Sequence, residues 1–455
     1  MVALRSARLE ALLSSPLELV QHADLMALIS NQVPEAFDLD FKSEMYGPTD
    51  KDRRDAATDV AALANTAGGL LVLGIEEDDQ ARATAAPGLE LSEADERRIR
   101  QIVGSQVVPM PVIDVLRIED PDRSGHGLVL IAVPRSPLAP HAVVVNDGLR
   151  YPRRNGATTR YLSEPEVADA YRERFAAPRR QADRASEVET DALGRLATTE
   201  DQAWVVVSLV PDLAGSLVIN QAALSAARDE LMGRQPLIMP TSLGWRRVSI
   251  GRHRILADGS MDNSRRARFL SADLHYDGAG AFAAFVLGPR PSQITPNTDE
   301  PETRQIDDEM VVNGILSGLR FLARHARDRT AAGGNALIRA QLYPVGGQQP
   351  LRLTYNRGFG RGFGDSLGDR IMTDAGAPPE RVAPLDALAA DGSDLVTATY
   401  LLATDVFQEF GWAEAAQFTS DGRVRLRYWR QEWHAPVTQW AATAGISTTQ
   451  ETLPG

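Results

Sequence analysis

The fold is decided by Ala61-Ala62-Leu63-Ala64-Asn65-Thr66-Ala67-Gly68-Gly69-Leu70-Leu71-Val72-Leu73-Gly74-Ile75. Apolar residues at helical spacing over residues 53–66 predict an amphipathic helix. Gly68-Gly69 ends that helix because glycine adopts the positive φ that a helix stop needs. The uninterrupted apolar run over residues 70–75 then predicts a buried strand, so that a helix leads directly into the core of a sheet.

A second strand is predicted just upstream, where Phe37-Asp38-Leu39-Asp40-Phe41-Lys42 alternates apolar and charged residues. A period of two places Asp38, Asp40 and Lys42 on one face of that strand. Two such carboxylates can share a divalent cation, and a neighbouring ammonium can stabilise phosphoryl charge or orient a water molecule. The alternative is a solvated strand face with a salt bridge, which spacing alone favours over the metal site.

Three more carboxylates could add oxygen ligands to this strand. Glu35 precedes Asp40 by five residues, and Glu76 and Glu77 follow directly after the apolar strand over residues 70–75. Acids at the ends of neighbouring strands can meet at one edge of a sheet. We therefore treat these residues as candidates for the same site as Asp40.

In this order, the features resemble the Schlafen AlbA-like domain, also called divergent AAA-4. The resemblance covers about residues 20–175 and, as an ordered set of elements, is specific. The matching elements are Glu35 to Asp40-Phe41-Lys42, residues 61–69, Leu73-Gly74-Ile75-Glu76-Glu77, Val108-Pro109, Ile131-Ala132-Val133-Pro134 with Pro140-His141, and Tyr151-Pro152-Arg153-Arg154-Asn155-Gly156-Ala157-Thr158-Thr159.

The resemblance implies nucleic-acid binding and, in some members, metal-dependent cleavage of structured RNA. It implies catalytic and metal-binding carboxylates at Glu35, Asp40 and Glu76 or Glu77, with Lys42 beside them and Mg²⁺ or Mn²⁺ as the metal. The family's glutamate is Asp40 here, one methylene shorter. We expect RNA rather than DNA as the partner, and we also expect a homodimer. The competing hypothesis is a noncatalytic regulator that binds DNA or a nucleotide.

Arginines are densest in a predicted hairpin near the end of this domain. Arg150, Arg153, Arg154 and Arg160 lie close together there and could contact phosphates as a nucleic-acid-binding patch. A solvated hairpin in which Arg154 holds a local acid explains the same residues. The sequence leaves the two interpretations open.

Composition excludes several classes of protein. The 455 residues include no cysteine, which rules out zinc–thiolate sites and cysteine nucleophiles. Only Lys42 and Lys51 are lysines, and neither follows a glycine, so a Walker-type ATP site is absent. A net charge of −13 argues against nonspecific coating of DNA. Without a membrane-spanning apolar run or a signal peptide, we expect a cytoplasmic protein.

The sequence predicts an α+β architecture with two domains. We expect a helical segment over residues 1–30, the Schlafen AlbA-like domain over 31–178, a polar helical linker over 179–200, a second mixed α/β domain over 201–440 and a disordered tail over 441–455. The second domain should contain a largely antiparallel sheet.

The second domain shows no family resemblance, and its sequence predicts no function. Residues 424–433 are expected to form a strand, since residues 428–434 alternate aromatic and charged side chains. Residues 289–302 and the glycine-rich segment over residues 357–364 are expected to be loops. Four histidines of this domain show no spacing typical of metal ligands: His253, His275, His325 and His434.

Overall fold

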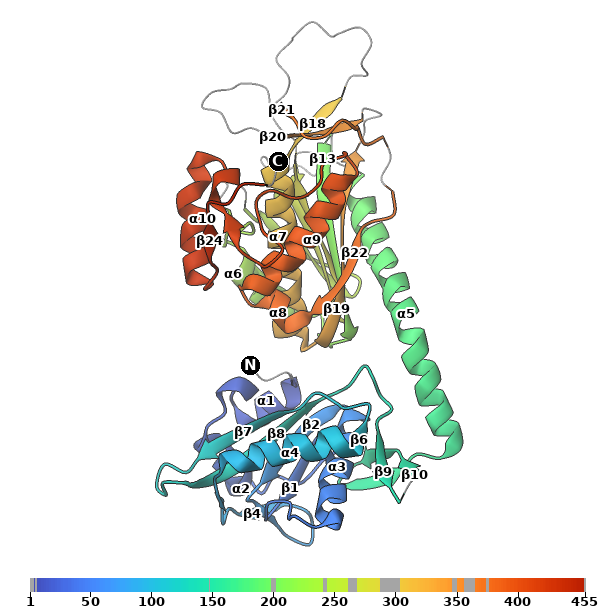
Figure 1. The fold of residues 1–455 in the computed structure, drawn as a ribbon, viewed down its shortest axis with the longest axis vertical. Coiled ribbons are helices and arrows are strands. Elements are labelled where there is room, and N and C mark those ends of the chain that lie inside the picture. Colours follow the sequence, from blue (N-terminus) through green and yellow to red (C-terminus); the bar gives the residue numbers. More distant parts are fainter. Residues whose placement is uncertain are drawn as a thin grey trace, which may run out of the picture. The chain divides into compact units, whose positions relative to one another are not determined.

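The computed structural model describes residues 4, 6–146, 148–197, 202–239, 244–260, 268–286, 303–345, 350–355, 365–373 and 376–453. The chain divides into unit 1 (Met1–Arg179) and unit 2 (Arg180–Gly455), each with helices and strands (Figure 1). The loops predicted over residues 289–302 and 357–364 lie outside the described residues. Within the described residues, no helix combines the length and apolar character needed to cross a membrane.

Unit 1 is built from short strands and four helices, followed by a long helix that continues into unit 2. Its helices are α1 (Ala7–Leu13), α2 (His22–Ser30), α3 (Asp50–Ala64), α4 (Glu93–Gln106) and α5 (Glu164–Leu196). Its strands are β1 (Leu39–Lys42), β2 (Gly68–Leu73), β3 (Glu76–Glu77), β4 (Ala83–Ala85), β5 (Leu89–Glu90), β6 (Val107–Val108), β7 (Asp114–Glu119), β8 (His126–Pro134), β9 (Ala142–Val145), β10 (Gly148–Arg150), β11 (Pro152–Asn155) and β12 (Thr158–Tyr161).

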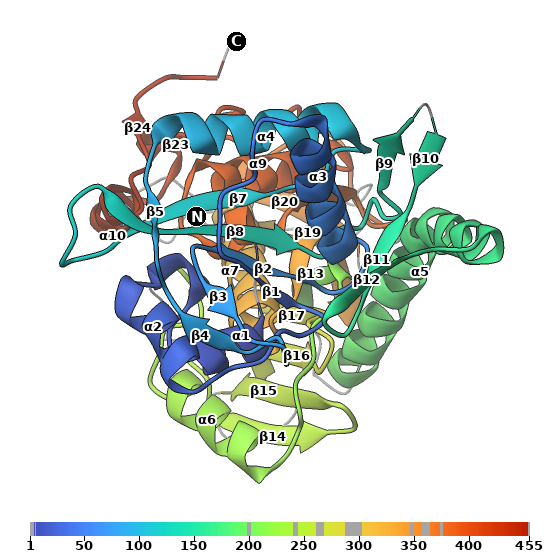
Figure 2. The same ribbon diagram turned by 90° about the horizontal axis from the view of Figure 1, so that it is seen from below.

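The central sheet of unit 1 explains why β2 is apolar throughout. The strand order is β1-β2-β8-β5, with β7 also on β8, and helices cover both faces (Figure 2). Leu71 and Leu73 pack towards α3 and α4, whereas Leu70 and Val72 pack towards α1 and α2. A strand buried on both faces needs an apolar residue at every position, which is why the run does not alternate.

The predicted helix and its glycine stop are both present. Thr49 caps α3 by accepting a hydrogen bond from the backbone N–H of Asp52, whose carboxylate in turn accepts from the backbone of Thr49. After the helix, Gly68 has a φ of 75° and Gly69 enters β2 against the backbone of Asp38. A Cβ on Gly69 would lie 2.4 Å from the Asp38 carbonyl oxygen. The glycine pair therefore allows β1 and β2 to pair as parallel neighbours.

Two hairpins extend beyond the central sheet. Strands β6, β9 and β10 form a small sheet in the order β10-β9-β6, and β11 pairs with β12 in an antiparallel hairpin. The hairpin β11–β12 lies beside α3 in Figure 2. It therefore reaches the end of α3 at which the predicted motif residues lie.

Unit 2 has strands from distant parts of the chain in one large sheet. Its strands are β13 (Gln202–Leu213), β14 (Arg247–Gly251), β15 (Arg254–Ser260), β16 (Arg268–His275), β17 (Gly280–Phe285), β18 (Arg304–Asp307), β19 (Gly333–Val345), β20 (Leu351–Tyr355), β21 (Asp365–Ser366), β22 (Glu380–Pro384), β23 (Val424–Arg425) and β24 (Thr448–Thr449). Its helices are α6 (Gln221–Leu231), α7 (Asp308–Arg324), α8 (Leu385–Ala389), α9 (Ser393–Gln408) and α10 (Gln431–Thr443).

The large sheet of unit 2 is antiparallel throughout, as the sequence predicted. Its order is β14-β15-β16-β17-β13-β19-β22. Alternate residues of β13 face opposite layers: Val205 and Val207 pack with α7, and Val210 packs with the second half of α5. Residues 180–196 of the predicted linker are thus part of α5 and cover one face of the sheet.

Two expectations for the C-terminal part are wrong. Residues 424–433 do not form one strand, because β23 ends at Arg425 and α10 begins at Gln431. Trp433, Val437 and Ala441 are buried at helical spacing on α10, so a helical packing period overrides the alternation of aromatic and charged residues. Residues 441–449 are also ordered, since β24 pairs with β23 and Ile446 is buried.

Gly69→Ala tests the close approach of β2 to β1. We expect the free energy of unfolding of unit 1 to fall by at least about 2 kcal/mol, because the new Cβ meets backbone that cannot move aside. Urea unfolding measures this change. Gly104→Ala in α4 is the matched control, since its Cβ makes only an ordinary contact and alanine should stabilise the helix by about 1 kcal/mol. Equal effects of the two variants would contradict the prediction.

Candidate nucleic-acid interface

The Asp40 carboxylate is the centre of a buried cluster of charged residues. Its Oδ2 lies 2.9 Å from the Lys42 ammonium, and its Oδ1 lies 3.1 Å from Nη1 of Arg154 in β11. Arg154 also donates a hydrogen bond to the carbonyl of Ala36. The side chains of Asp40 and Arg154 are 2% and 4% exposed. The pair therefore links β1 to the β11–β12 hairpin across 114 residues of sequence.

Glu35 completes the cluster as a second carboxyl group. Its Oε1 accepts a hydrogen bond of 2.8 Å from the backbone N–H of Phe41, and its Oε2 lies 3.8 Å from Arg154. Burial and a hydrogen bond with Asp40 raise the pKa of Glu35 to about 8. Burial also acts to raise the pKa of Asp40, but the hydrogen bond from Glu35 and the charges of Lys42 and Arg154 outweigh it and lower that pKa. Glu35 therefore carries the proton, and Asp40 the negative charge.

Sequence reasoning missed two members of this cluster. Tyr46 is buried and donates a hydrogen bond of 2.8 Å to Oδ2 of Asp59 on α3. Burial raises the pKa of Asp59 to about 6. A signal was present, because Asp59 stands at helical spacing from Ala56 and Leu63 on the buried face of α3.

The remaining acids predicted for the site lie apart from this cluster. Asp38 precedes β1, and its carboxylate pairs with Arg8 of α1, so Asp38 does not share a face with Asp40. Glu76 and Glu77 are exposed on β3, which pairs with β4. The charge of Glu77 still contributes to the raised pKa of Glu35.

This arrangement does not fit a divalent cation. Both Asp40 oxygens already contact basic groups, and Glu35 contacts a backbone N–H and the Asp40 carboxyl. Across the part of the chain that the structure describes, no group of three or more His, Asp or Glu side chains is spaced to hold a metal ion. The Mg²⁺ or Mn²⁺ site and the catalytic roles of Glu35, Asp40, Lys42, Glu76 and Glu77 stay predictions.

The Asn65-Thr66 pair fastens the two hairpins to the end of α3. Asn65 donates to the carbonyls of His141 and Pro152, each at 2.8 Å, and accepts from the backbone N–H of His141 at 2.6 Å. Thr66 accepts a hydrogen bond from the backbone N–H of Arg154. These bonds hold the start of β9 and the whole of β11 at fixed positions. The motif residues therefore position the arginines of the hairpin.

Neighbouring arginines of β11 face opposite sides of the hairpin. Arg154 is buried against Asp40 and has to be removed from the predicted nucleic-acid-binding set. Arg153 is exposed and stands directly opposite Arg160 of β12. Arg160 pairs with Glu166, whereas Arg153 forms no side-chain hydrogen bond or ion pair with any residue that the structure describes. Arg150 is exposed as well, 6.0 Å from the centre of the half-exposed Tyr161 ring.

Comparison with known proteins identifies the class of this unit. Residues 35–163 match the family model described as Schlafen, AlbA_2. Unit 1 therefore contains a Schlafen AlbA_2 domain, which confirms the resemblance, and this family points to nucleic-acid binding. Unit 2 lies outside the match. A search of curated proteins found no match to the chain.

Two solved structures resemble part of the chain. The DIP2311 protein from Corynebacterium diphtheriae is 22% identical over 37% of this chain and 29% of its own length, with a TM-score of 0.24. The N-terminal domain of a RecG-related protein from Nitrosomonas europaea is 20% identical over 32% of this chain and 95% of its own length, with a TM-score of 0.23. The chain thus spans less than a third of the first of these proteins.

Asp40→Asn tests the buried ion cluster. The substitution removes the carboxylate that Arg154 contacts at 3.1 Å, and removing one partner of a buried ion pair costs about 3–5 kcal/mol in proteins. We expect urea unfolding to show a loss of this size in unit 1. Asp55→Asn, at an exposed position on the same helix as Asp59, should change the free energy of unfolding by less than about 0.5 kcal/mol. A loss below 1 kcal/mol for Asp40→Asn would contradict the assignment.

Glu35→Gln tests the shared proton. Because the pKa of Glu35 rises from 4.5 when unfolded to about 8 when folded, the folded protein binds the extra proton between these values. The stability that this proton contributes is therefore lost as the pH rises through this window. Glutamine removes the dependence, so unfolding measured from pH 5 to pH 9 should show a smaller decline for Glu35→Gln than for wild type. Glu44→Gln, at an exposed site, should keep the wild-type decline.

Proposed function

We propose that the Schlafen AlbA_2 domain binds nucleic acid through the exposed face of the β11–β12 hairpin. The observation that carries the proposal is the cross-strand pair of Arg153 and Arg160. Glu166 balances the charge of Arg160, whereas Arg153 has no acidic partner among the described residues, so a phosphate would supply the partner that Arg153 lacks. Arg150 lies in the adjoining strand β10 and would extend the same contact. The buried Asp40 cluster then acts as the anchor of the hairpin.

RNA with unpaired bases is the substrate class that Tyr161 and Arg150 support best, and Tyr161 lies on the face of the hairpin opposite to Arg160. The Tyr161 ring is 47% exposed at the end of β12, next to the Arg150 guanidinium. An exposed aromatic ring can stack on an unpaired base while neighbouring arginines contact phosphates. Double-helical DNA does not offer its bases for such stacking. The combination favours single-stranded segments, such as the loops of a structured RNA.

Metal-dependent cleavage of RNA is the second candidate function. It is favoured by the contact between the Glu35 and Asp40 carboxyl groups and by Lys42, whose side chain remains 34% exposed beside them. Against it stands the pairing of Asp40 with two basic side chains. Binding without cleavage is therefore the function that we propose for this domain.

Arg153→Ala tests the binding surface. We expect the affinity for a hairpin RNA with an unpaired loop to fall about tenfold. The slope of the logarithm of the binding constant against the logarithm of the salt concentration should also become shallower by about one, because one phosphate contact is lost. Fluorescence anisotropy at several salt concentrations measures both. Arg123→Ala is the matched control, since Arg123 lies in the turn between β7 and β8, at the other end of the unit from β11–β12 in Figure 2. Equal losses for the two variants would refute a localised hairpin surface.

Incubation of structured RNA with and without Mn²⁺ separates binding from cleavage. We expect the full-length protein to bind the RNA and to leave it intact under both conditions, because Asp40 is neutralised by Lys42 and Arg154. Cleavage that requires Mn²⁺ and disappears in Glu35→Gln would establish the second candidate instead. Denaturing gels detect the products, and the Arg153→Ala variant shows whether such cleavage depends on the hairpin.

A further inference from the structure

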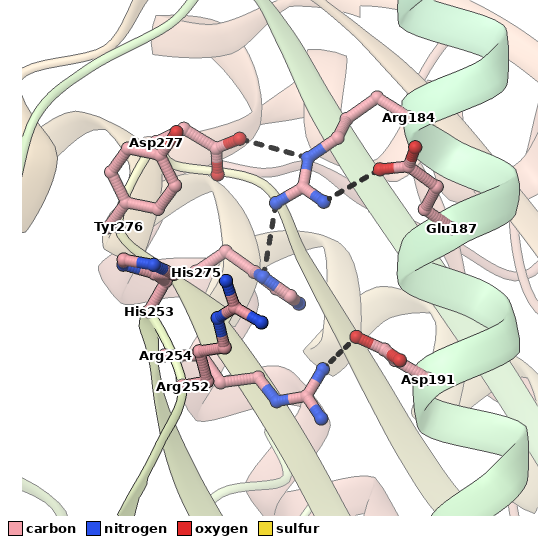
Figure 3. A pocket seen from close by; sticks show the side chains of 9 residues that line it. All are labelled: Arg184, Glu187, Asp191, Arg252, His253, Arg254, His275, Tyr276 and Asp277. Atoms are coloured by element: carbon pink, nitrogen blue, oxygen red, sulfur yellow. Dashed lines mark hydrogen bonds and ion pairs between the residues drawn. The ribbon is translucent and has the colours of Figure 1, made fainter.

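Unit 2 contains a polar cavity of about 530 Å³ that the proposed function does not use (Figure 3). Three segments line it: the second half of α5, the turn between β14 and β15, and the end of β16 with the residues that follow. The lining residues are Arg184, Glu187, Asp191, Arg252, His253, Arg254, His275, Tyr276 and Asp277. The cavity therefore forms only when these segments meet in the folded unit.

Three arginines of this cavity differ in their partners. Arg184 lies 2.9 Å from Asp277 and 3.1 Å from Glu187, and Arg254 pairs with Asp191. Arg252 forms no hydrogen bond or ion pair with the residues that the structure describes. Figure 3 shows the three guanidinium groups around one space, with acidic partners for two of them. Because each guanidinium carries five N–H groups, donors remain after these pairings.

His275 adds a buried donor without an acceptor. Nη2 of Arg184 lies 3.1 Å from Nδ1 of His275, and since a guanidinium only donates, Nδ1 must accept. The proton of the neutral ring is then on Nε2, which is buried and has no partner among the described residues. Burial and the charges of Arg184 and Arg254 lower the pKa of His275 to about 4. Near neutral pH the ring is therefore a fixed donor.

Two further observations show that this cavity is a formed site. Nε of Arg254 lies 3.5 Å from Oδ2 of the buried Asp273, so Asp191 and Asp273 together hold this guanidinium in place. His253 adopts a φ of 57°, and its ring packs 5.5 Å from that of Tyr276, which fixes the tip of the β14–β15 turn. Arg252 is presented by that turn. The guanidinium of Arg252 is therefore placed at the cavity without a partner among the described residues, and a bound anion would supply one.

We propose that this cavity binds the phosphate group of a small phosphomonoester. Such a group offers three terminal oxygens and about two negative charges, which match several donors better than the two oxygens of a carboxylate. Arg252 provides the cationic group that has no acidic partner among the described residues, and the free N–H groups of Arg184 and Arg254 provide direction. The acids at this cavity contact Arg184 and Arg254, and none of them contacts Arg252. Selectivity therefore comes from the arrangement of the donors.

Arg252→Ala tests the site in the full-length protein. Inorganic phosphate and adenosine monophosphate serve as probes in isothermal titration at constant ionic strength, with adenosine as the ligand that lacks phosphate. We expect both phosphate probes to bind wild type and to bind Arg252→Ala at least tenfold more weakly. Arg247→Ala, at an exposed position of β14, is the matched control and should bind within twofold of wild type. No binding of either probe at 20 mM, or equal binding by Arg252→Ala, would overturn the proposal.

The nuclear magnetic resonance of the histidine rings provides a second readout. Phosphate should shift the His275 ring signals, identified by their absence in a His275→Gln variant, because an anion bound by Arg184 changes the electric field at the ring whose Nδ1 accepts from that guanidinium. An oligonucleotide without terminal phosphate distinguishes the source of the phosphate. If it binds in an Arg252-dependent manner while both phosphate probes fail, the cavity serves a nucleic-acid backbone and the proposal is wrong. Loss of RNA binding in Arg153→Ala would not affect this result, since that residue lies in unit 1.

Discussion

The buried contact of Asp40 with Arg154 is the interaction on which the candidate surface of unit 1 depends. It joins a strand of the central sheet to a hairpin more than a hundred residues later in the chain. Burying two charges is costly, and the cost is offset only when both are paired and hydrogen-bonded. Lys42, Glu35 and the Ala36 carbonyl provide those additional contacts. The hairpin is therefore held in one position, and the side chain of Arg153, next to Arg154, points away from the core.

The fold of unit 1 could be predicted well because its strongest signals are local. The helix with its glycine stop and the apolar strand after it depend on residues close together in the sequence. Leu70 and Leu71 pack on opposite faces of the sheet, yet either face requires the same kind of residue. An apolar run thus predicts a strand without predicting its neighbours. The family model matches the same region.

The site of unit 1 was harder to predict, because it depends on the residue at which β1 begins and on which side chains the neighbouring elements place beside it. Asp38 and Asp40 are two residues apart and would share one face of a continuous strand. However, β1 begins only at Leu39, and the Asp38 side chain pairs with Arg8. Arg153 and Arg154 look equivalent in the sequence, and only the pairing of β11 with β12 assigns one to solvent and the other to the core. The cavity of unit 2 joins three segments that share no sequence motif.

Residue type carries little information on function in a chain with 46 arginines among its 48 basic residues. Arginine here serves inside the protein, where its planar group makes several directed hydrogen bonds, as well as on the surface. The partner of each arginine is therefore the informative property. In unit 1 the paired Arg154 fixes the direction of Arg153, and in unit 2 the paired Arg184 and Arg254 frame Arg252. Arg153 and Arg252 have no acidic partner among the described residues, which is why both of our proposals place an anion at such an arginine.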